Sequence, residues 1–156
     1  MNLQTDTRKE LLQNLFNEVS NSIELSKRRY FHVHTIENLI FHFDEIRTEN
    51  DKKWVYETLL SYLTVCVEIA PSIDRRIGEE IFYGHIDKLT DYYFSNVGFS
   101  LVLNRELVYS IYISVIILCY FIFNFYIVIG MTLLFSFMTL RTFKKYKEKR
   151  VYGLFW

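Results

Sequence analysis

One stretch of this sequence, residues 107–140, contains no Asp, Glu, Lys, Arg, His or Pro. It reads LVYSIYISVIILCYFIFNFYIVIGMTLLFSFMTL. About 20 apolar residues are enough for a helix to cross a bilayer, and an uncharged run longer than about 18 is a candidate for membrane insertion. A buried helix of a soluble protein is rarely so long. We therefore expect this stretch to lie in a membrane and to dictate how the rest of the chain is arranged.

The length of the run favours two membrane crossings over one. A single helix from residue 107 to residue 140 would be about 51 Å long, whereas the hydrocarbon core of a bilayer is about 30 Å thick. Tilting absorbs only part of such an excess. We expect two helices, Glu106–Phe121 and Tyr126–Phe143, with a turn at Ile122–Phe125. The turn surrounds Asn124, a residue type that tolerates turn conformations.

Charges on either side of the run indicate an even number of crossings. The sequence that follows it, RTFKKYKEKR, carries six basic residues and one acidic residue, and the positive-inside rule places such a segment in the cytoplasm. The first residues, MNLQTD, lack the basic region and apolar core of a signal peptide. We therefore expect a hairpin in the bacterial inner membrane with both termini in the cytoplasm.

We expect three segments: a cytosolic helical sensor or interaction domain at residues 1–98, a transmembrane hairpin at 99–143 and a basic cytosolic tail at 144–156. The net charge of zero conceals an uneven distribution. Residues 1–106 carry 12 Lys and Arg against 17 Asp and Glu, whereas residues 141–156 carry six against one. By charge, the first part is no general nucleic-acid binder, while the tail suits contact with anionic membrane lipids.

Apolar residues in the first part follow helical spacing, without the sustained alternation that indicates strands. The predicted fold class is all-α, with an antiparallel helical bundle ahead of the C-terminal hairpin. The expected helices cover residues 7–27, 36–50, 52–70 and 72–94. Thr7 and Glu10 form a capping box at the first start. Pro71 ends the third helix, and Ser72 can cap the fourth.

Basic residues gather in two of the expected connections between helices. If the fourth helix descends to the membrane, the first and third connections lie together at the far tip of an upright bundle. Free N–H groups in the first turn of a helix also attract anions. Two interpretations stay open: ordinary solvated charges, or a phosphate site with Tyr30 and Phe31 placed to stack on a base. The candidate phosphate-binding residues are Lys27, Arg28, Arg29, Arg75 and Arg76.

Signals for catalysis or metal binding are weak. Arg29 and His34 have the R-x4-H spacing of HEPN ribonucleases, but the residue after the arginine is not the polar one common in that family. His32 and His34 have no matched cluster of Cys, Asp or His at metal-ligand spacing. Cys66 falls in a predicted cytosolic helix and Cys119 in the membrane run, so we expect no disulfide. We predict no enzymatic activity, no metal site and no cofactor.

Small hydroxyl residues recur at helical spacing in both expected membrane helices. They stand at i and i+4 in the first and at i, i+4 and i+7 in the second, which is one helix face in each case. Such residues either pack helices together or line a polar path. Two short spans cannot enclose a pore, so conduction would require a homo-oligomer, a tetramer or larger. The residues are Ser110, Ser114, Thr132, Ser136 and Thr139.

Three features appear in order along the chain: the helical part 7–94, the apolar run 107–140, and the basic tail that ends in VYGLFW. This layout resembles the two-transmembrane effectors of bacterial anti-phage defence systems and is most similar to the Hailong-type channel effector. The resemblance implies a partner nucleotidyltransferase whose nucleotide or oligonucleotide product binds the basic tip. Infection would then change the ligand level and open an inner-membrane pore. The alternative is a membrane-anchored interaction protein, such as an immunity or adaptor protein, without channel activity.

Overall fold

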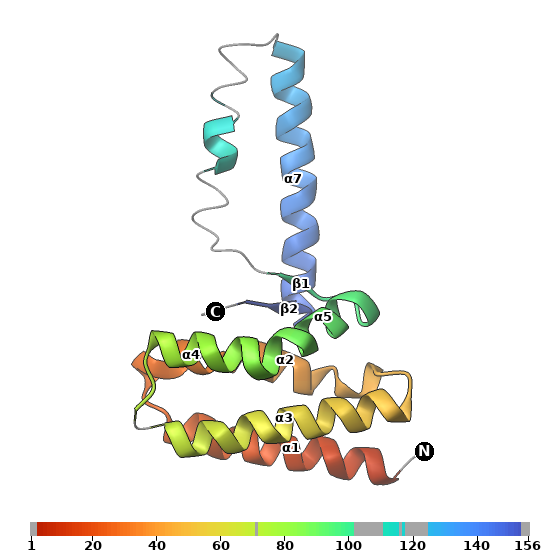
Figure 1. Cartoon of the computed structure of the whole chain (residues 1–156). Helices are drawn as coiled ribbons and strands as arrows, with labels where there is room; N and C mark the ends of the chain where they lie inside the picture. Colours follow the sequence, from red (N-terminus) through yellow and green to blue (C-terminus); the bar gives the residue numbers. More distant parts are fainter. Residues whose placement is uncertain (1–2, 71, 102–110, 116, 118–124, 154–156) are drawn as a thin grey trace.

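The computed structural model describes residues 3–70, 72–101, 111–115, 117 and 125–153, and it is mostly helical (Figure 1). This confirms the all-α class that the sequence predicts. The helices α1 to α5 form a body, and a further helix, α7, stands out from it (Figure 1).

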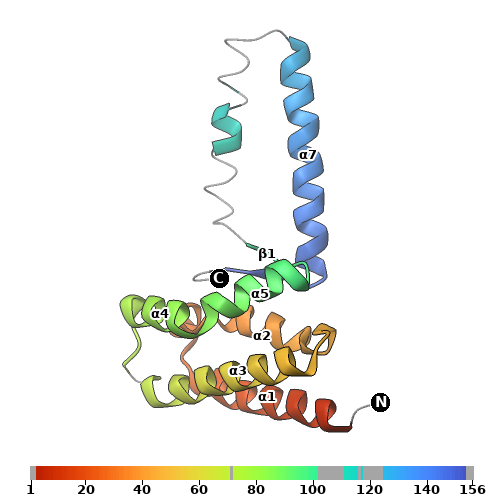
Figure 2. The same cartoon turned by 45° about the vertical axis from the view of Figure 1, so that its right-hand side comes forward.

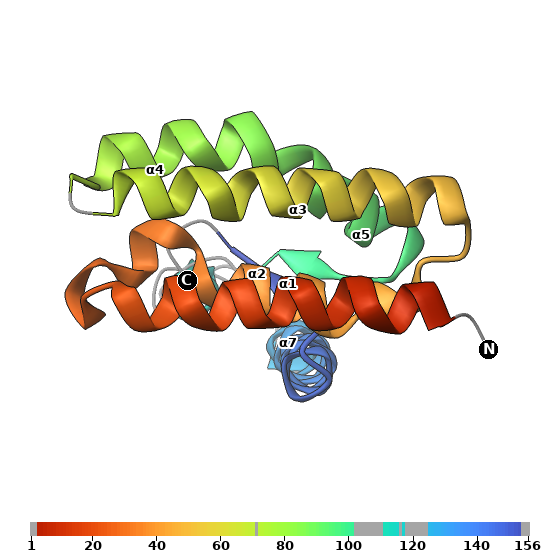
Figure 3. The same cartoon turned by 90° about the horizontal axis from the view of Figure 1, so that it is seen from below.

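The body begins with helices that run back and forth. Their order is α1 (Leu3–Ser22), η1 (Leu25–Phe31), α2 (Val33–Phe41), η2 (Phe43–Glu45) and α3 (Glu49–Ile69). Because α2 returns between them, α1 and α3 run in the same direction, side by side (Figure 3). A guanidinium nitrogen of Arg8, near the start of α1, accordingly lies 4.0 Å from a carboxylate oxygen of Glu49 at the start of α3.

The predicted fourth helix is interrupted in its middle. It consists of α4 (Arg75–Ile81), the π-helical turn η3 (Phe82–Ile86) and α5 (Asp87–Asn96). Together with α2 these elements form an upper layer over α1 and α3 (Figure 2). Apolar residues at helical spacing from both layers fill a single core, which buries Leu12, Leu39, Leu59, Ile86 and Leu89 completely. Helix formation here follows from burial of these amphipathic faces.

Two helix starts differ from the capping predictions. α1 begins before Thr7, which lies inside the helix, so the predicted capping box is wrong. Asp74 rather than Ser72 caps α4, because the Asp74 carboxylate accepts a hydrogen bond from the Ile77 amide at 2.9 Å. Ser and Asp are both favoured N-cap residue types, and backbone geometry decides which of them caps the helix.

The second helix begins earlier than the predicted residue 36 and ends earlier than the predicted residue 50. His32 adopts a left-handed backbone conformation (φ 49°) immediately before α2, and α2 ends at Phe41. Thr48 then caps α3, since its hydroxyl accepts a hydrogen bond from the Asp51 amide at 3.1 Å. The polar and charged residues between these points therefore form connections instead of continuing the helix.

Two short strands bring the end of the body and the end of the chain together, contrary to the expectation of no strands. β1 (Ser100–Leu101) and β2 (Val151–Tyr152) pair in parallel, with Ser100 opposite Val151. The Ser100 amide also donates to the Arg150 carbonyl at 3.0 Å. Alternation over only two residues cannot be read from a sequence. The chain thus leaves the body at β1 and returns beside the same point at β2.

The helix α7 (Phe125–Lys147) contains the predicted second membrane helix, 126–143, and continues beyond it. Figure 3 shows α7 end-on while α1 and α3 are seen along their length, so α7 stands across the body. The expected upright bundle in line with the membrane helices is therefore wrong. Between α5 and β1 the chain turns at Gly98, whose backbone is left-handed (φ 83°), and the next side chain, Phe99, is buried.

Residues 111–115 and 117 are helical and contact α7. The ring centroids of Tyr112 and Phe135 lie 4.3 Å apart, and the Tyr112 hydroxyl lies 3.5 Å from the sulfur of Met138. Within the described ranges, we find no helix that combines the length and the apolar character needed to span a membrane. Several predicted features lie outside the described residues: Pro71, Ser110, Cys119, Asn124 and the rest of the turn before Phe125.

Candidate functional site

The two connections that carry the candidate phosphate-binding residues lie next to each other. The helix α4 packs against η1 at Gly78, where an added Cβ would come within 2.8 Å of the Tyr30 carbonyl oxygen. His32 Nε2 lies 3.0 Å from the Gly78 carbonyl oxygen, and burial lowers the pKa of this ring although that hydrogen bond raises it. The fold thus brings η1 and the start of α4 together.

Most of the arginines in this region contact groups of the protein itself. Arg75 and Arg76 lie 3.1 Å from the carboxylates of Glu79 and Glu80, each one helical turn further along α4. Arg29 donates to the Tyr30 hydroxyl at 2.8 Å and lies over its ring, and Arg28 donates to the Ser20 carbonyl at 3.1 Å. Lys27 is half-buried in η1. The arginines could bind an anion only by exchanging these contacts.

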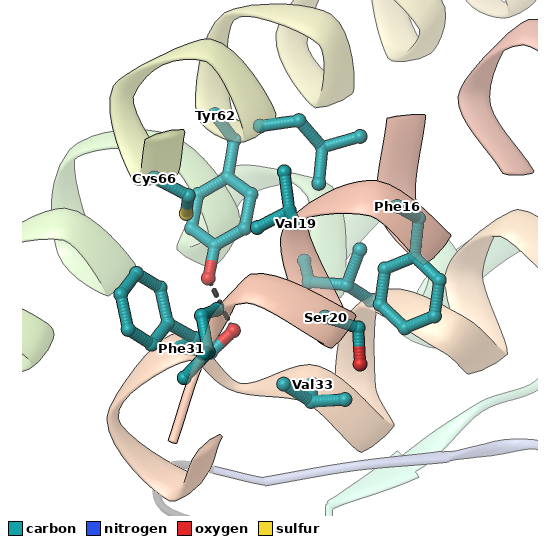
Figure 4. A pocket seen from close by; sticks show the side chains of 10 residues that line it. Phe16, Val19, Ser20, Phe31, Val33, Tyr62 and Cys66 are labelled. Atoms are coloured by element: carbon teal, nitrogen blue, oxygen red, sulfur yellow. Dashed lines mark hydrogen bonds between the residues drawn. The ribbon is translucent and has the colours of Figure 1, made fainter. Parts of the chain in front are cut away.

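An apolar cavity of about 10 Å³ lies between α1, η1, α2 and α3 (Figure 4). Its volume is near the minimum that holds one water molecule. The hydroxyl of Tyr62 donates to the Phe31 carbonyl at its edge, and burial raises the pKa of the neighbouring Cys66 thiol to about 12 despite an opposing hydrogen bond with Tyr62. A thiol with such a pKa is protonated near neutral pH and is a poor nucleophile. This cavity is a void in the core, not a ligand site.

A larger, polar cavity of about 100 Å³ lies where the start of α3 meets the end of α5. The Tyr92 hydroxyl donates to an Asp51 carboxylate oxygen at 3.1 Å. Burial, and then the nearby Asp51, raise the pKa of Tyr92 to about 12. The cavity is lined by Glu45, Arg47, Thr48, Asp51, Tyr92, Asn96 and Val97. In the part of the chain that the structure describes, no three His, Cys, Asp or Glu side chains gather in a metal-binding arrangement.

The most extensive polar contacts of the body hold residues 148–153, which we call the C-terminal strap. Thr35 and Asn38 on α2 and His42, the residue just after its end, follow helical spacing and are buried. The Thr35 hydroxyl bonds both the carbonyl (3.0 Å) and the amide (3.1 Å) of Gly153. Asn38 Nδ2 donates to the Val151 carbonyl at 2.9 Å, and His42 Nε2 lies 2.7 Å from the Glu148 carbonyl oxygen. The buried polar stripe of α2 therefore binds the backbone of the strap.

Basic residues near the end of the chain add ionic contacts to the body. Lys149 Nζ lies 2.7 Å from a Glu37 carboxylate oxygen, and Arg150 Nη2 lies 2.8 Å from Glu45 Oε2. Arg150 also donates to the Val97 carbonyl, and Lys145 Nζ donates to the Ser100 hydroxyl at 2.6 Å. Basic residues of the predicted tail at 144–156 thus form ion pairs and hydrogen bonds with the body.

Sequence reasoning missed the strap, although two signals were present. Three polar residues share the face of α2 that apolar neighbours mark as buried, and buried polar groups require partners. The apolar sequence VYG directly after the basic residues is also unusual for a solvated tail.

The hydroxyls of the predicted second membrane helix bond within that helix. Thr132 donates to the Val128 carbonyl at 2.8 Å, Ser136 to that of Thr132 at 2.9 Å, and Thr139 to that of Phe135 at 2.9 Å. Ser114 is exposed on the other helical segment, and Ser110 is outside the described residues. These hydroxyls can therefore lie in an apolar environment with their donors satisfied.

Comparison with protein-family models, with curated proteins and with solved structures found no match to this chain.

Proposed function

We propose that the predicted segment 99–143 is a transmembrane hairpin that fixes the body at the surface of a bilayer. The exposed apolar surface of α7 carries this proposal: the fractional exposure of Leu133, Phe137 and Leu140 is 66%, 67% and 68%. Large apolar side chains also point outward at Leu134, Met138 and Phe143. An apolar surface that extends over several sides of a helix is unstable in water and requires lipid or other chains around it.

The charge pattern along α7 suits such a position. Its apolar part, residues 125–140, would measure about 24 Å at about 1.5 Å per residue, somewhat less than the hydrocarbon core of about 30 Å. Arg141, Lys144 and Lys147 follow immediately and are exposed. Long basic side chains reach toward the interface, and bilayers thin locally around short helices.

The pairing of β1 with β2 supports an even number of crossings. The chain leaves the body at Leu101 and returns at Val151, and these strands lie side by side. The bond from Lys145 to Ser100 ties the end of α7 to the same point. A hairpin that starts and ends on one face of the membrane fits this pairing of β1 with β2. Both termini would then lie in the cytoplasm of a bacterial cell.

As activity we propose an oligomeric inner-membrane channel or membrane-disrupting effector, controlled by the cytosolic body. Ser136 and Thr132 lie exposed on α7, on the stripe that a neighbouring copy or a water path would contact. The strap, which directly follows α7, is hydrogen-bonded to the body. A tetramer or larger assembly is required, since one hairpin cannot enclose a pore. The resemblance of the sequence layout to Hailong-type effectors supports a proposed role in anti-phage defence.

The proposed control signal is a nucleotide or oligonucleotide bound at Lys27, Arg28, Arg29, Arg75 and Arg76. The contact between η1 and α4 supports a shared site. Surface ion pairs such as Arg75–Glu79 contribute about 0.3–0.5 kcal/mol within a helix, whereas a charge-assisted bond to phosphate contributes about 1.5–3 kcal/mol. An anionic ligand can therefore displace Glu79 and Glu80.

A second candidate is a membrane-anchored interaction protein without channel activity. It is favoured by the hydrogen bonds of Thr132, Ser136 and Thr139 to their own helix, because these hydroxyls then need no water. Reconstitution into liposomes separates the two candidates. Co-flotation with ion flux supports the channel, co-flotation without flux under any nucleotide condition supports the anchor, and failure to float contradicts both.

A further inference from the structure

The polar cavity between the start of α3 and the end of α5 is large enough to hold a small organic molecule. Its volume is about 100 Å³, whereas one water molecule requires about 10–15 Å³. The apolar void beside Tyr62 measures only about 10 Å³. Of these two cavities, the polar one therefore combines hydrogen-bonding side chains with room for a ligand.

Arg47 supplies a cation to this cavity. Within the part of the chain that the structure describes, the Arg47 side chain forms no ion pair and no hydrogen bond. Its charge acts inside the cavity: burial, and then Asp51, raise the pKa of Tyr92 to about 12, and Arg47 opposes that rise. A guanidinium presents a planar fork of N–H donors that matches a carboxylate. Arg47 is therefore suited to bind an anionic group of a ligand.

The two acidic residues of the cavity differ in how far the protein satisfies them. Glu45 Oε1 lies 2.7 Å from His42 Nδ1, and Glu45 Oε2 lies 2.8 Å from Arg150 Nη2, so both oxygens have partners. Asp51 accepts a hydrogen bond from the Tyr92 hydroxyl at Oδ2 only. Among the described residues, none donates to Asp51 Oδ1. This oxygen can accept a hydrogen bond from an ammonium group.

The charges of the cavity disfavour a ligand that carries a single charge. Arg47 would repel a metal cation, and the described residues provide no cluster of three metal-ligating side chains. Asp51 and Glu45 would repel a simple anion. A molecule with an anionic group and an ammonium group a few bonds apart satisfies both sides. The helix dipoles agree with this polarity, because the start of α3 favours negative charge and the end of α5 favours positive charge.

We propose that this cavity binds a small amino acid in its zwitterionic form. Arg47 donates to the carboxylate of the ligand, and Asp51 Oδ1 accepts from its ammonium group. The Thr48 hydroxyl, which accepts from the Asp51 amide, and the Asn96 amide, which donates to the Tyr92 carbonyl at 3.0 Å, complete the polar wall. The volume suits glycine, alanine or serine and is too small for an aromatic amino acid. This site is separate from the proposed phosphate site and does not depend on membrane insertion.

Equilibrium dialysis of the full-length protein in detergent micelles against radiolabelled L-alanine tests the site. We expect saturable binding that excess glycine displaces, whereas acetate and methylamine, which each carry one of the two charges, do not. Arg47→Gln and Asp51→Asn should each weaken binding at least about tenfold, because each removes a charge-assisted contact. Lys53→Gln and Glu57→Gln are the matched controls. They change the same charges on α3, at exposed residues that pair with each other at 3.9 Å and do not line the cavity.

The absence of saturable binding of alanine and glycine would show that the cavity holds water only, and it would overturn the proposal. An equal loss of affinity in the control variants, or displacement by acetate or methylamine as readily as by glycine, would also contradict it. O-Phosphoethanolamine carries the charges of a lipid headgroup, and tighter binding of this probe than of alanine would contradict an amino-acid ligand. If Asp51→Asn lowers the helical content, Arg47→Gln decides alone, since the Arg47 side chain is exposed.

Discussion

The hydroxyl of Thr35 bonds both backbone groups of Gly153, donating to the carbonyl at 3.0 Å and accepting from the amide at 3.1 Å. The Thr35 side chain on α2 thus provides hydrogen-bond partners for both backbone groups of Gly153, a residue that follows α7 in the chain. Through this pair, the body and the end of the long helix behave as one unit. Mutation of either residue should therefore affect the stability of the body.

Thr35→Val keeps the shape of the side chain and removes both hydrogen bonds. The buried amide and carbonyl of Gly153 lose their partner, which costs about 1–3 kcal/mol. Urea unfolding in detergent should show this decrease in the free energy of unfolding. Thr64→Val is the matched control, because Thr64 is exposed and bonds only the backbone of its own helix. Equal effects of the two substitutions would contradict a special role for Thr35.

Gly78→Ala tests the contact between η1 and α4. The added methyl group would lie 2.8 Å from the Tyr30 carbonyl oxygen, so backbone must shift, and such overpacking costs about 1–3 kcal/mol. Gly84→Ala is the control, since nothing lies within 4 Å of the Cβ position there. Thermal unfolding should show a lower midpoint for Gly78→Ala only. The same midpoint shift in both variants would show that the close approach at Gly78 is unimportant.

Replacement of Arg75 and Arg76 by Glu tests the proposed anionic ligand. If these side chains bind phosphate, affinity for a fluorescent single-stranded oligonucleotide should fall more than about tenfold for each lost contact. Arg8→Glu changes the charge as much as each of these two replacements does, at a residue of α1 that pairs with Glu49. Fluorescence anisotropy at fixed salt gives the comparison. An equal loss of affinity in Arg8→Glu would show that net charge alone explains the result. Unchanged binding in the double variant would show that Arg75 and Arg76 do not bind the ligand.

The raised pKa of Cys66 predicts a dependence of stability on pH. The thiol is protonated in the folded state up to about pH 12, whereas an exposed thiol ionises near pH 8.5, about its ordinary pKa. The unfolded state therefore binds fewer protons above that pH, and this contribution to stability is lost as the pH rises from about 9 toward 12. Comparison of wild type with Cys66→Ala by urea unfolding measures the difference in slope. Identical slopes would contradict the burial of the thiol.

Ser136→Leu separates a pore-lining role from helix contact. A ring of leucines in a pore would favour dewetting and reduce ion flux, without preventing insertion into the membrane. If Ser136 instead contacts a neighbouring helix, the larger side chain should loosen the oligomer. Liposome conductance and particle mass in mild detergent, measured on the same variant, distinguish these results. A wild type that conducts no ions would leave only the anchored interaction protein.

The helical class and the positions of most helices could be predicted, because apolar residues such as Leu12, Leu59 and Leu89 repeat at helical spacing and are buried. The strap could not be predicted in the same way. Its bonds from Thr35, Asn38 and His42 to the backbone depend on tertiary approach and not on the side chains of the strap. The left-handed backbone of Gly98, where the chain turns from α5 toward β1, is likewise not revealed by any periodicity.

For the candidate phosphate site, the sequence predicted which segments lie together but not which contacts their side chains make. The sequence located Arg75 and Arg76 at the start of a helix and near the first connection, and the fold brings these segments together. We did not predict that Glu79 and Glu80, one turn later, would lie 3.1 Å from the two guanidinium groups. Such pairs follow from the i, i+4 geometry of a helix and are visible in a sequence once the helix boundaries are known.

The most direct test of the membrane hairpin is the accessibility of single cysteines in intact bacterial spheroplasts, with Cys66 and Cys119 replaced. Leu101→Cys and Lys147→Cys, both at exposed positions at the base of the hairpin, should react with an impermeant maleimide only after the membrane is permeabilised. Phe137→Cys should stay unreactive in both conditions, although the side chain is exposed on α7. Labelling of Leu101→Cys or Lys147→Cys from outside, or ready labelling of Phe137→Cys, would contradict a hairpin with both ends on the cytoplasmic face.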